Sequence, residues 1–321
     1  VRAGDLRKWL ECQIQGGAKL RLGLRGEAEG DPADLAEEPF EADFLAQRGL
    51  VRELFWESLQ GDLDLEQAYE ARVWGLREAV KAPAGFLGEG DRRKALTLIE
   101  GWRSLLAPGT EPQVHRFGSD RSRGTLAAEA HPAISWPLEL GGRTVTLVLE
   151  GQTEPQWAEG SLLLSERKAP GKKGPEVKDR RELLRAWFDQ LLMAAAGLKV
   201  GPHRARVLAS AEENRAWHAD LPELDQAGAR ERLGAWVREA LLEPRWTLMP
   251  IEGVLEESAK EEGDLEDWVE KQQGSDPASF SSLHGPLKGL LEVEVEPDWK
   301  ALAQARYGDF LAWSNSWGGG L

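Results

Sequence analysis

Apolar positions recur at helical spacing through most of the first hundred residues of the chain. This periodicity predicts helices over residues 5–15, 42–61, 63–80 and 92–109. In the second of these segments, Phe44, Val51 and Leu54 fall on one face. Glycine and proline interrupt the pattern at 82–91, and they also punctuate an acidic stretch at 26–39 that we interpret as a linker or loop. The first part of the chain is therefore predicted to be helical.

Further along the chain, apolar and polar residues begin to alternate. Two alternating runs, 133–140 and 143–151, flank Gly141-Gly142 and predict a β-hairpin. Beyond it the pattern predicts a third strand at 161–168, a helix at 182–197, a fourth strand at 203–210 and a helix at 229–243. This order indicates an α/β core built on a mixed sheet. We expect three regions: a helical lead-in packed on the core (1–130), the α/β core (131–243) and an acidic, mostly helical C-terminal extension (244–321).

Composition limits the classes of function. The chain has 321 residues, with 40 Lys and Arg against 55 Asp and Glu, for a net charge of −15. Such a charge argues against a stand-alone binder of duplex DNA, because phosphate neutralisation drives that binding. Cys12 is the single cysteine, which excludes an internal disulfide and fits a reducing cytoplasm. No apolar run has membrane-spanning length, and a chain that begins with Val1 suggests a fragment of a longer protein.

The candidate chemistry lies in and beside the predicted hairpin. Glu154 follows the second strand, and Glu166 and Lys168 alternate on one face of the third. Two converging carboxylates could hold Mg²⁺, and the lysine could orient or activate a water, as in metal-dependent nucleases. The acid-x-Lys pattern also arises by chance in a chain with 30% charged residues, as at Glu176–Lys178 and Asp298–Lys300. A working site, a remnant of one and a coincidence all remain open from the residues.

A basic segment follows these candidate residues. Its cationic members are Lys168, Lys172, Lys173, Lys178, Arg180 and Arg181. They are candidates for contacts with DNA phosphates, and a solvated loop leading into a helix explains them equally well.

The five histidines show no metal-binding spacing. They are His115, His131, His203, His218 and His284. We expect them at partly exposed loop positions, without a metal or acid–base role. The sequence also contains no Gly-x-Ser-x-Gly motif and no P-loop, so neither a serine hydrolase nor an ATPase is predicted.

Six segments, in order along most of the chain, resemble the C-terminal region of the RecC (gamma) subunit of exodeoxyribonuclease V, the RecBCD helicase–nuclease. They are LRKWLECQIQGGAKLRLGL, EEPFEADFLAQRGLVRELF, APAGFLGEG, LEGQTEPQW, VKDRRELLRAWFDQLLMAAAG and EPRWTLMPIEG. The ordered set carries the resemblance, since none of the six is diagnostic by itself.

The resemblance implies a PD-(D/E)XK nuclease-like fold that has generally lost its catalytic set. It also implies RecB- and RecD-type subunits as partners, DNA within the assembled complex, and a role in double-strand-break repair by splitting and guiding DNA. No cofactor is then expected. Glu154, Glu166 and Lys168 fall where an active member carries its acid and acid-x-Lys, so an active Mg²⁺-dependent nuclease is the alternative. The following helix lacks the family's Gln-x-x-x-Tyr, and a generic acidic interaction domain is a third interpretation.

Overall fold

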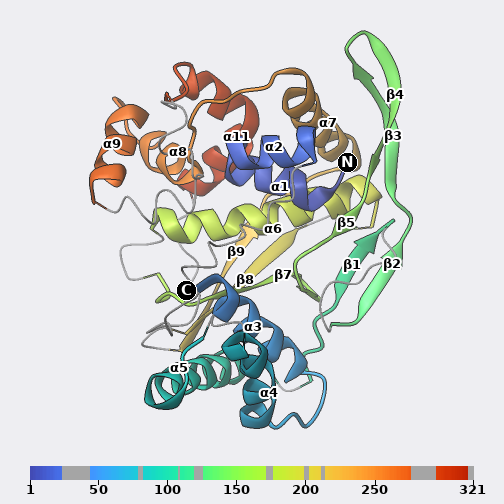
Figure 1. Ribbon diagram of the computed structural model, residues 1–321. Helices are drawn as coiled ribbons and strands as arrows, with labels where there is room; N and C mark the ends of the chain where they lie inside the picture. The colour runs from blue at the N-terminus through green and yellow to red at the C-terminus, as the bar shows by residue number, and fades with distance from the viewer. Residues whose placement is uncertain are drawn as a thin grey trace.

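A computed structural model describes most of the chain as a mixed α/β protein (Figure 1). The described residues are 1–23, 44–78, 82–107, 109–118, 126–170, 176–198, 202–210, 214–275 and 294–316. The helices are α1 (Ala3–Glu11), α2 (Gln13–Leu22), α3 (Phe44–Glu57), α4 (Leu65–Glu78), α5 (Gly85–Ser104), α6 (Val177–Ala196), α7 (Gln226–Leu242), α8 (Ile251–Glu257), α9 (Leu265–Ser275) and α11 (Trp299–Ser316). The strands are β1 (Val114–Phe117), β2 (Ala128–His131), β3 (Ile134–Leu140), β4 (Arg143–Leu149), β5 (Gly151–Gln152), β6 (Gln156–Trp157), β7 (Gly160–Ser165), β8 (His203–Ser210) and β9 (Asn214–Leu221). The expected α/β class is confirmed at this level.

The central sheet has the order β6-β7-β8-β9 and is covered on both faces. Strand β7 runs parallel to β8 and antiparallel to β6, and β9 is antiparallel to β8. Leu163 of β7 packs with α6, whereas Leu162 and Leu164 pack with α3, α4 and α5. Successive side chains of a strand point to opposite faces, so a continuous run of leucines suits a strand buried on both sides. Figure 1 shows α6 along one face of this sheet and α3–α5 against the other.

One large apolar cluster joins the three regions expected from the sequence. Trp187 of α6 packs on Trp236 of α7 and on Phe310 of α11, with ring centroids 5.3 and 5.1 Å apart. Leu6 and Trp9 of α1 belong to the same cluster. The first and the last described helices, α1 and α11, therefore pack on the core through shared aromatic and aliphatic contacts.

The predicted hairpin is confirmed as β3 and β4. Its strands pair from Ile134 opposite Leu149 to Leu140 opposite Arg143. Gly141 and Gly142 have φ values of 58° and 76°, and this tight two-residue turn needs positive φ at both positions. The two strands form a sheet of their own, at the edge of the view in Figure 1. The hairpin thus lies outside the central sheet that holds the predicted third and fourth strands.

Other predicted boundaries were wrong. The segment expected as one helix over 5–15 is two helices, because Cys12 is extended and α2 folds back on α1. A side chain at Gly16 would lie 2.1 Å from the backbone of Trp9, so this close crossing requires glycine. Helix α5 begins at Gly85, within the stretch expected to break the pattern. The third strand ends at Ser165, before Glu166 and Lys168.

Strands β1, β2, β6 and β9 lie outside the predicted strands. Strand β9 follows β8 directly and pairs with it along its whole length. Strands β1 and β2 pair in parallel within and next to the region expected to be helical, and β5 pairs antiparallel with β1. Strands β1 and β2 have four residues each, too few for a period of two to stand out from the sequence. No helix in the described ranges combines the length and apolar character needed to cross a membrane.

Candidate functional site

The carboxylate of Glu154 lies against arginines from three helices. Glu154 sits between β5 and β6, and Arg7 of α1 donates to its Oε1 at 2.5 Å. Burial disfavours the charged carboxylate, but the positive charges of Arg7, Arg185 and Arg52 outweigh burial and hold the pKa of Glu154 below its usual value. The side chain is therefore ionised at neutral pH and already has cationic neighbours of its own.

Asp189 lies beside Glu154 and anchors a buried polar network. Its carboxylate accepts from the backbone N–H of Glu154 at 3.1 Å, from Gln156 at 2.9 Å and from Ser161 at 2.8 Å. Burial, followed by the negative charge of Glu154, raises the pKa of Asp189 to about 8. Asp189 does not stand out in the sequence, because one acid within an apolar helical pattern carries no distinctive signal.

Ser161 links this network to His203, with 2.9 Å between Ser161 Oγ and His203 Nε2. In a Ser-His-Asp triad the histidine stands between the other two groups, whereas here the serine does. Ser161 and His203 are also buried, at 0% and 1% exposed. The arrangement therefore links β7, β8 and α6 through buried hydrogen bonds and does not present a nucleophile to a substrate.

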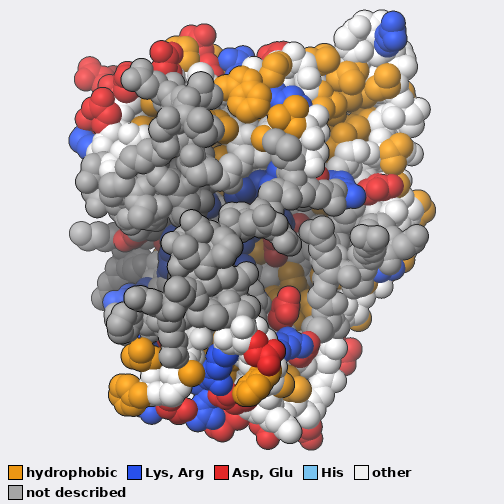
Figure 2. Space-filling model, in the orientation of Figure 1, with side chains coloured by type: hydrophobic (Ala, Val, Ile, Leu, Met, Phe, Trp, Pro, Cys, Tyr) orange, Lys and Arg blue, Asp and Glu red, His pale blue; other side chains and the backbone are white. Residues whose placement is uncertain are grey.

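Glu166 lies just beyond β7 and is paired with α3. Arg48 Nε donates to its Oε1 at 2.6 Å. One turn further along α3, Arg52 donates to the backbone carbonyl of Leu164 at 3.1 Å. Lys168 is exposed. Each carboxylate of the predicted metal site is thus held by its own arginine. Figure 2 shows blue Lys and Arg atoms near the centre of this face, at about the level of α6.

The basic segment is only partly described. Lys172, Lys173 and the side chain of Lys178 lie outside the described residues. Arg180 is half-buried, and burial lowers the pKa of its guanidinium. Arg181 pairs with Glu252 of α8 at 2.5 Å, so this member of the predicted strip packs against the protein's own carboxylate. The phosphate-contact interpretation rests on the remaining members.

The prediction that the histidines lie in loops was wrong for four of the five. His115, His131, His203 and His218 are on strands, and His284 lies outside the described residues. Glu129 and His131 are two residues apart on β2, so their side chains lie on the same face of the strand. This spacing is visible in the sequence and could have indicated the pair.

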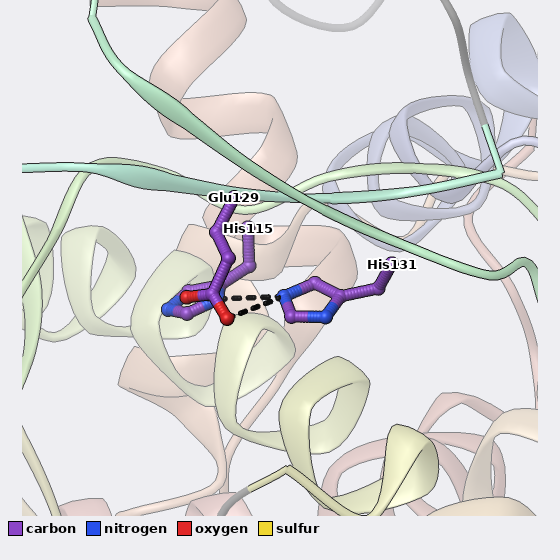
Figure 3. Close-up of side chains that lie close together, drawn as sticks. All are labelled: His115, Glu129 and His131. Carbon is purple, nitrogen blue, oxygen red and sulfur yellow. Dashed lines mark hydrogen bonds and ion pairs between the residues drawn. The ribbon is translucent and has the colours of Figure 1, made fainter.

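Two of these histidines form a cluster with a carboxylate. His115 Nδ1 lies 3.0 Å from His131 Nε2 and 3.4 Å from Glu129 Oε2. His131 Nε2 lies 3.8 Å from Glu129 Oε1. Figure 3 shows the two imidazoles turned toward each other with the carboxylate reaching over them. Among the described residues, this is the one group of three or more His, Cys, Asp or Glu side chains close enough to share a metal ion.

No protein-family description matches the chain, and no curated protein is significantly similar to it.

Proposed function

We propose that the chain is a non-catalytic, nuclease-like domain of a RecC-type subunit that guides DNA and docks partner subunits in a helicase–nuclease for double-strand-break repair. The observation that carries this proposal is the pairing of both candidate acids with arginines, Glu154 with Arg7 and Glu166 with Arg48. A guanidinium stays protonated at any physiological pH, so it competes permanently with a metal ion for the same oxygens.

The order of elements supports the nuclease-like part of the proposal. The hairpin β3–β4, strand β7, helix α6, strand β8 and helix α7 occur in the order that the resemblance implies, with β5, β6 and β9 as additional strands between them. Glu154 and Glu166 flank the antiparallel pair β6–β7. Two carboxylates suited to a metal site therefore lie beside neighbouring strands, and each of them is paired with an arginine from a helix.

Exposed apolar side chains on the helical layer below the sheet support partner docking. Trp74 of α4 is 62% exposed, and Phe86 and Leu87 at the start of α5 are 90% and 43% exposed. Aromatic side chains that are exposed in the free protein are enriched at protein–protein interfaces, where the partner buries them. A net charge of −15 suits a protein partner better than free DNA.

Co-purification tests the docking role. We expect the wild-type chain to be retained by RecB- and RecD-type subunits, and Phe86→Ser to weaken retention by at least about tenfold, as for a hot-spot residue. Leu242→Ser is the matched control, since Leu242 is 48% exposed on α7, away from this surface. Equal retention of both variants and the wild type would place the interface elsewhere.

A salt titration with forked DNA tests the guiding role. The assembled complex should bind the fork with an affinity that falls as salt rises, and Lys172→Ala together with Lys173→Ala should reduce that slope. An unchanged slope would remove the basic segment from the DNA path.

An active Mg²⁺-dependent nuclease using Glu154, Glu166 and Lys168 is the second candidate, favoured by the position of both acids beside β6–β7. In that case cleavage with Mg²⁺ or Mn²⁺ disappears in Glu166→Gln and persists in Asp298→Asn, which alters the same acid-x-Lys pattern at an exposed position. For a non-catalytic domain, neither the wild type nor the variants cleave DNA.

A further inference from the structure

The parallel pairing of β1 and β2 brings three metal-binding side chains together. His115 lies opposite Glu129, and Phe117 lies opposite His131. Since alternate residues of a strand share a face, His115, Glu129 and His131 all project from the same side of this small sheet. The cluster is separate from Glu154 and its arginines, and the proposed function makes no use of it.

The distances between the ligand atoms suit a common ion. Two nitrogens about 2.1 Å from one metal, and separated by an angle between octahedral and tetrahedral values, lie about 3.0–3.4 Å apart. The two imidazole nitrogens are 3.0 Å apart, and Glu129 Oε2 is 3.4 Å from the first of them. Glu129 is 52% exposed, so its carboxylate can adjust to reach the ion.

The surroundings hold the backbone of His115 and the ring of His131 in place. The backbone N–H of His115 donates to Thr153 Oγ1 at 3.1 Å, and the N–H of Thr153 donates to the carbonyl of His115 at 3.0 Å. Phe117 stacks on the ring of His131, with centroids 5.4 Å apart. The two histidine side chains are 12% and 11% exposed. Two ligands are therefore largely fixed before any ion binds, which lowers the entropic cost of binding.

We propose that His115, Glu129 and His131 form a binding site for a divalent transition-metal ion of the Zn²⁺ type. Two imidazoles and one carboxylate are the protein ligands of many Zn²⁺ and Fe²⁺ sites, and they leave further coordination positions for water or an external ligand. Bound metal ties β1 to β2, two strands of four residues each. The site would thus stabilise this edge of the protein and present an open metal position to solvent.

Titration of the purified protein with Zn²⁺, and with Co²⁺ as a spectroscopic probe, tests the site. The wild type should bind one metal ion per chain, and binding should saturate. Bound Co²⁺ should give visible absorption bands typical of coordination by imidazole. Glu129→Gln and His131→Asn should each weaken binding by at least about 100-fold, since loss even of the groups that support metal ligands costs about 10–100-fold. His218→Asn, on strand β9, is the matched control and should bind as the wild type does.

Thermal unfolding of the same proteins without and with Zn²⁺ separates binding from folding. The Tm of the wild type and of His218→Asn should rise with Zn²⁺, and the Tm of Glu129→Gln should not, although its metal-free Tm equals that of the wild type. Binding of equal strength in all variants would assign the ion to scattered acidic groups and overturn the proposal. Absence of saturable binding would overturn it as well, and would leave the 3.0 Å contact as a hydrogen bond between the two imidazoles.

Discussion

Among the described residues, two sets of side chains offer metal-binding atoms, and they differ in the basic groups that surround their carboxylates. Glu154 and Glu166 face arginines, whereas Glu129 faces two histidines. An imidazole can lose its proton and then bind a metal through the same nitrogen. A guanidinium does neither, so it occupies a carboxylate permanently. The type of basic side chain beside the carboxylate, more than the number of acids, therefore separates a candidate metal site from a structural ion pair.

The largest expected effect concerns Asp189, beside the arginine-held acids. Its pKa in the folded protein is raised to about 8 from an ordinary value of 3.8, so the folded state binds a proton that the unfolded state has released. Stability contributed by this proton is full below about pH 4 and is lost as pH rises toward 8, at up to about 1.4 kcal/mol per pH unit. Asp189→Asn should flatten this part of the profile, measured by urea unfolding at a series of pH values. An Asn variant with the wild-type slope would show that Asp189 is ionised in the folded protein.

Removal of Arg7 is the next largest change. Arg7→Ala leaves the partly buried Glu154 without its closest cation, and we expect a loss of about 2–3 kcal/mol in the free energy of unfolding. Adding Glu154→Gln should restore part of that loss. Arg93→Ala, an exposed position on α5, serves as the control and should change stability by less than about 0.5 kcal/mol. No recovery in the double variant would mean that Arg7 acts through packing rather than charge.

Arg48→Ala should cost about 1 kcal/mol, because its pair with Glu166 is partly open to solvent, with side chains 32% and 22% exposed. Removal of both arginines tests whether they exclude a metal ion from the two carboxylates. If arginine is what excludes metal, the combined Arg7→Ala and Arg48→Ala variant should bind Mn²⁺ more tightly than the wild type, as measured by calorimetry. Equal affinity would mean that the two carboxylates lie too far apart to share an ion.

The smallest expected effect lies in the histidine cluster. Glu129→Gln should change the metal-free stability by less than about 0.5 kcal/mol, because the carboxylate is half exposed. Glu154→Gln is the matched substitution in the other group, and chemical unfolding should show the larger loss there, since it leaves the arginines around Glu154 without a negative partner. A larger loss for Glu129→Gln than for Glu154→Gln would mean that Glu129 stabilises the fold in the absence of metal.

Local pattern by itself determined the mixed α/β class, the hairpin around Gly141-Gly142 and the long helix α6. These features depend on turn residues and on apolar spacing within one segment, both of which are visible in a single sequence. The residue types at Glu154 and Glu166 were visible for the same reason.

The partners of those acids depend on long-range packing. Arg7 and Glu154 are 147 residues apart in sequence, and Arg48 and Glu166 are 118 apart. Likewise, the register that places His115 opposite Glu129 comes from pairing two short strands with no periodic signal of their own. Contacts across such separations are selected by the packing of whole layers, because only the assembled core fixes which helix face meets which strand end.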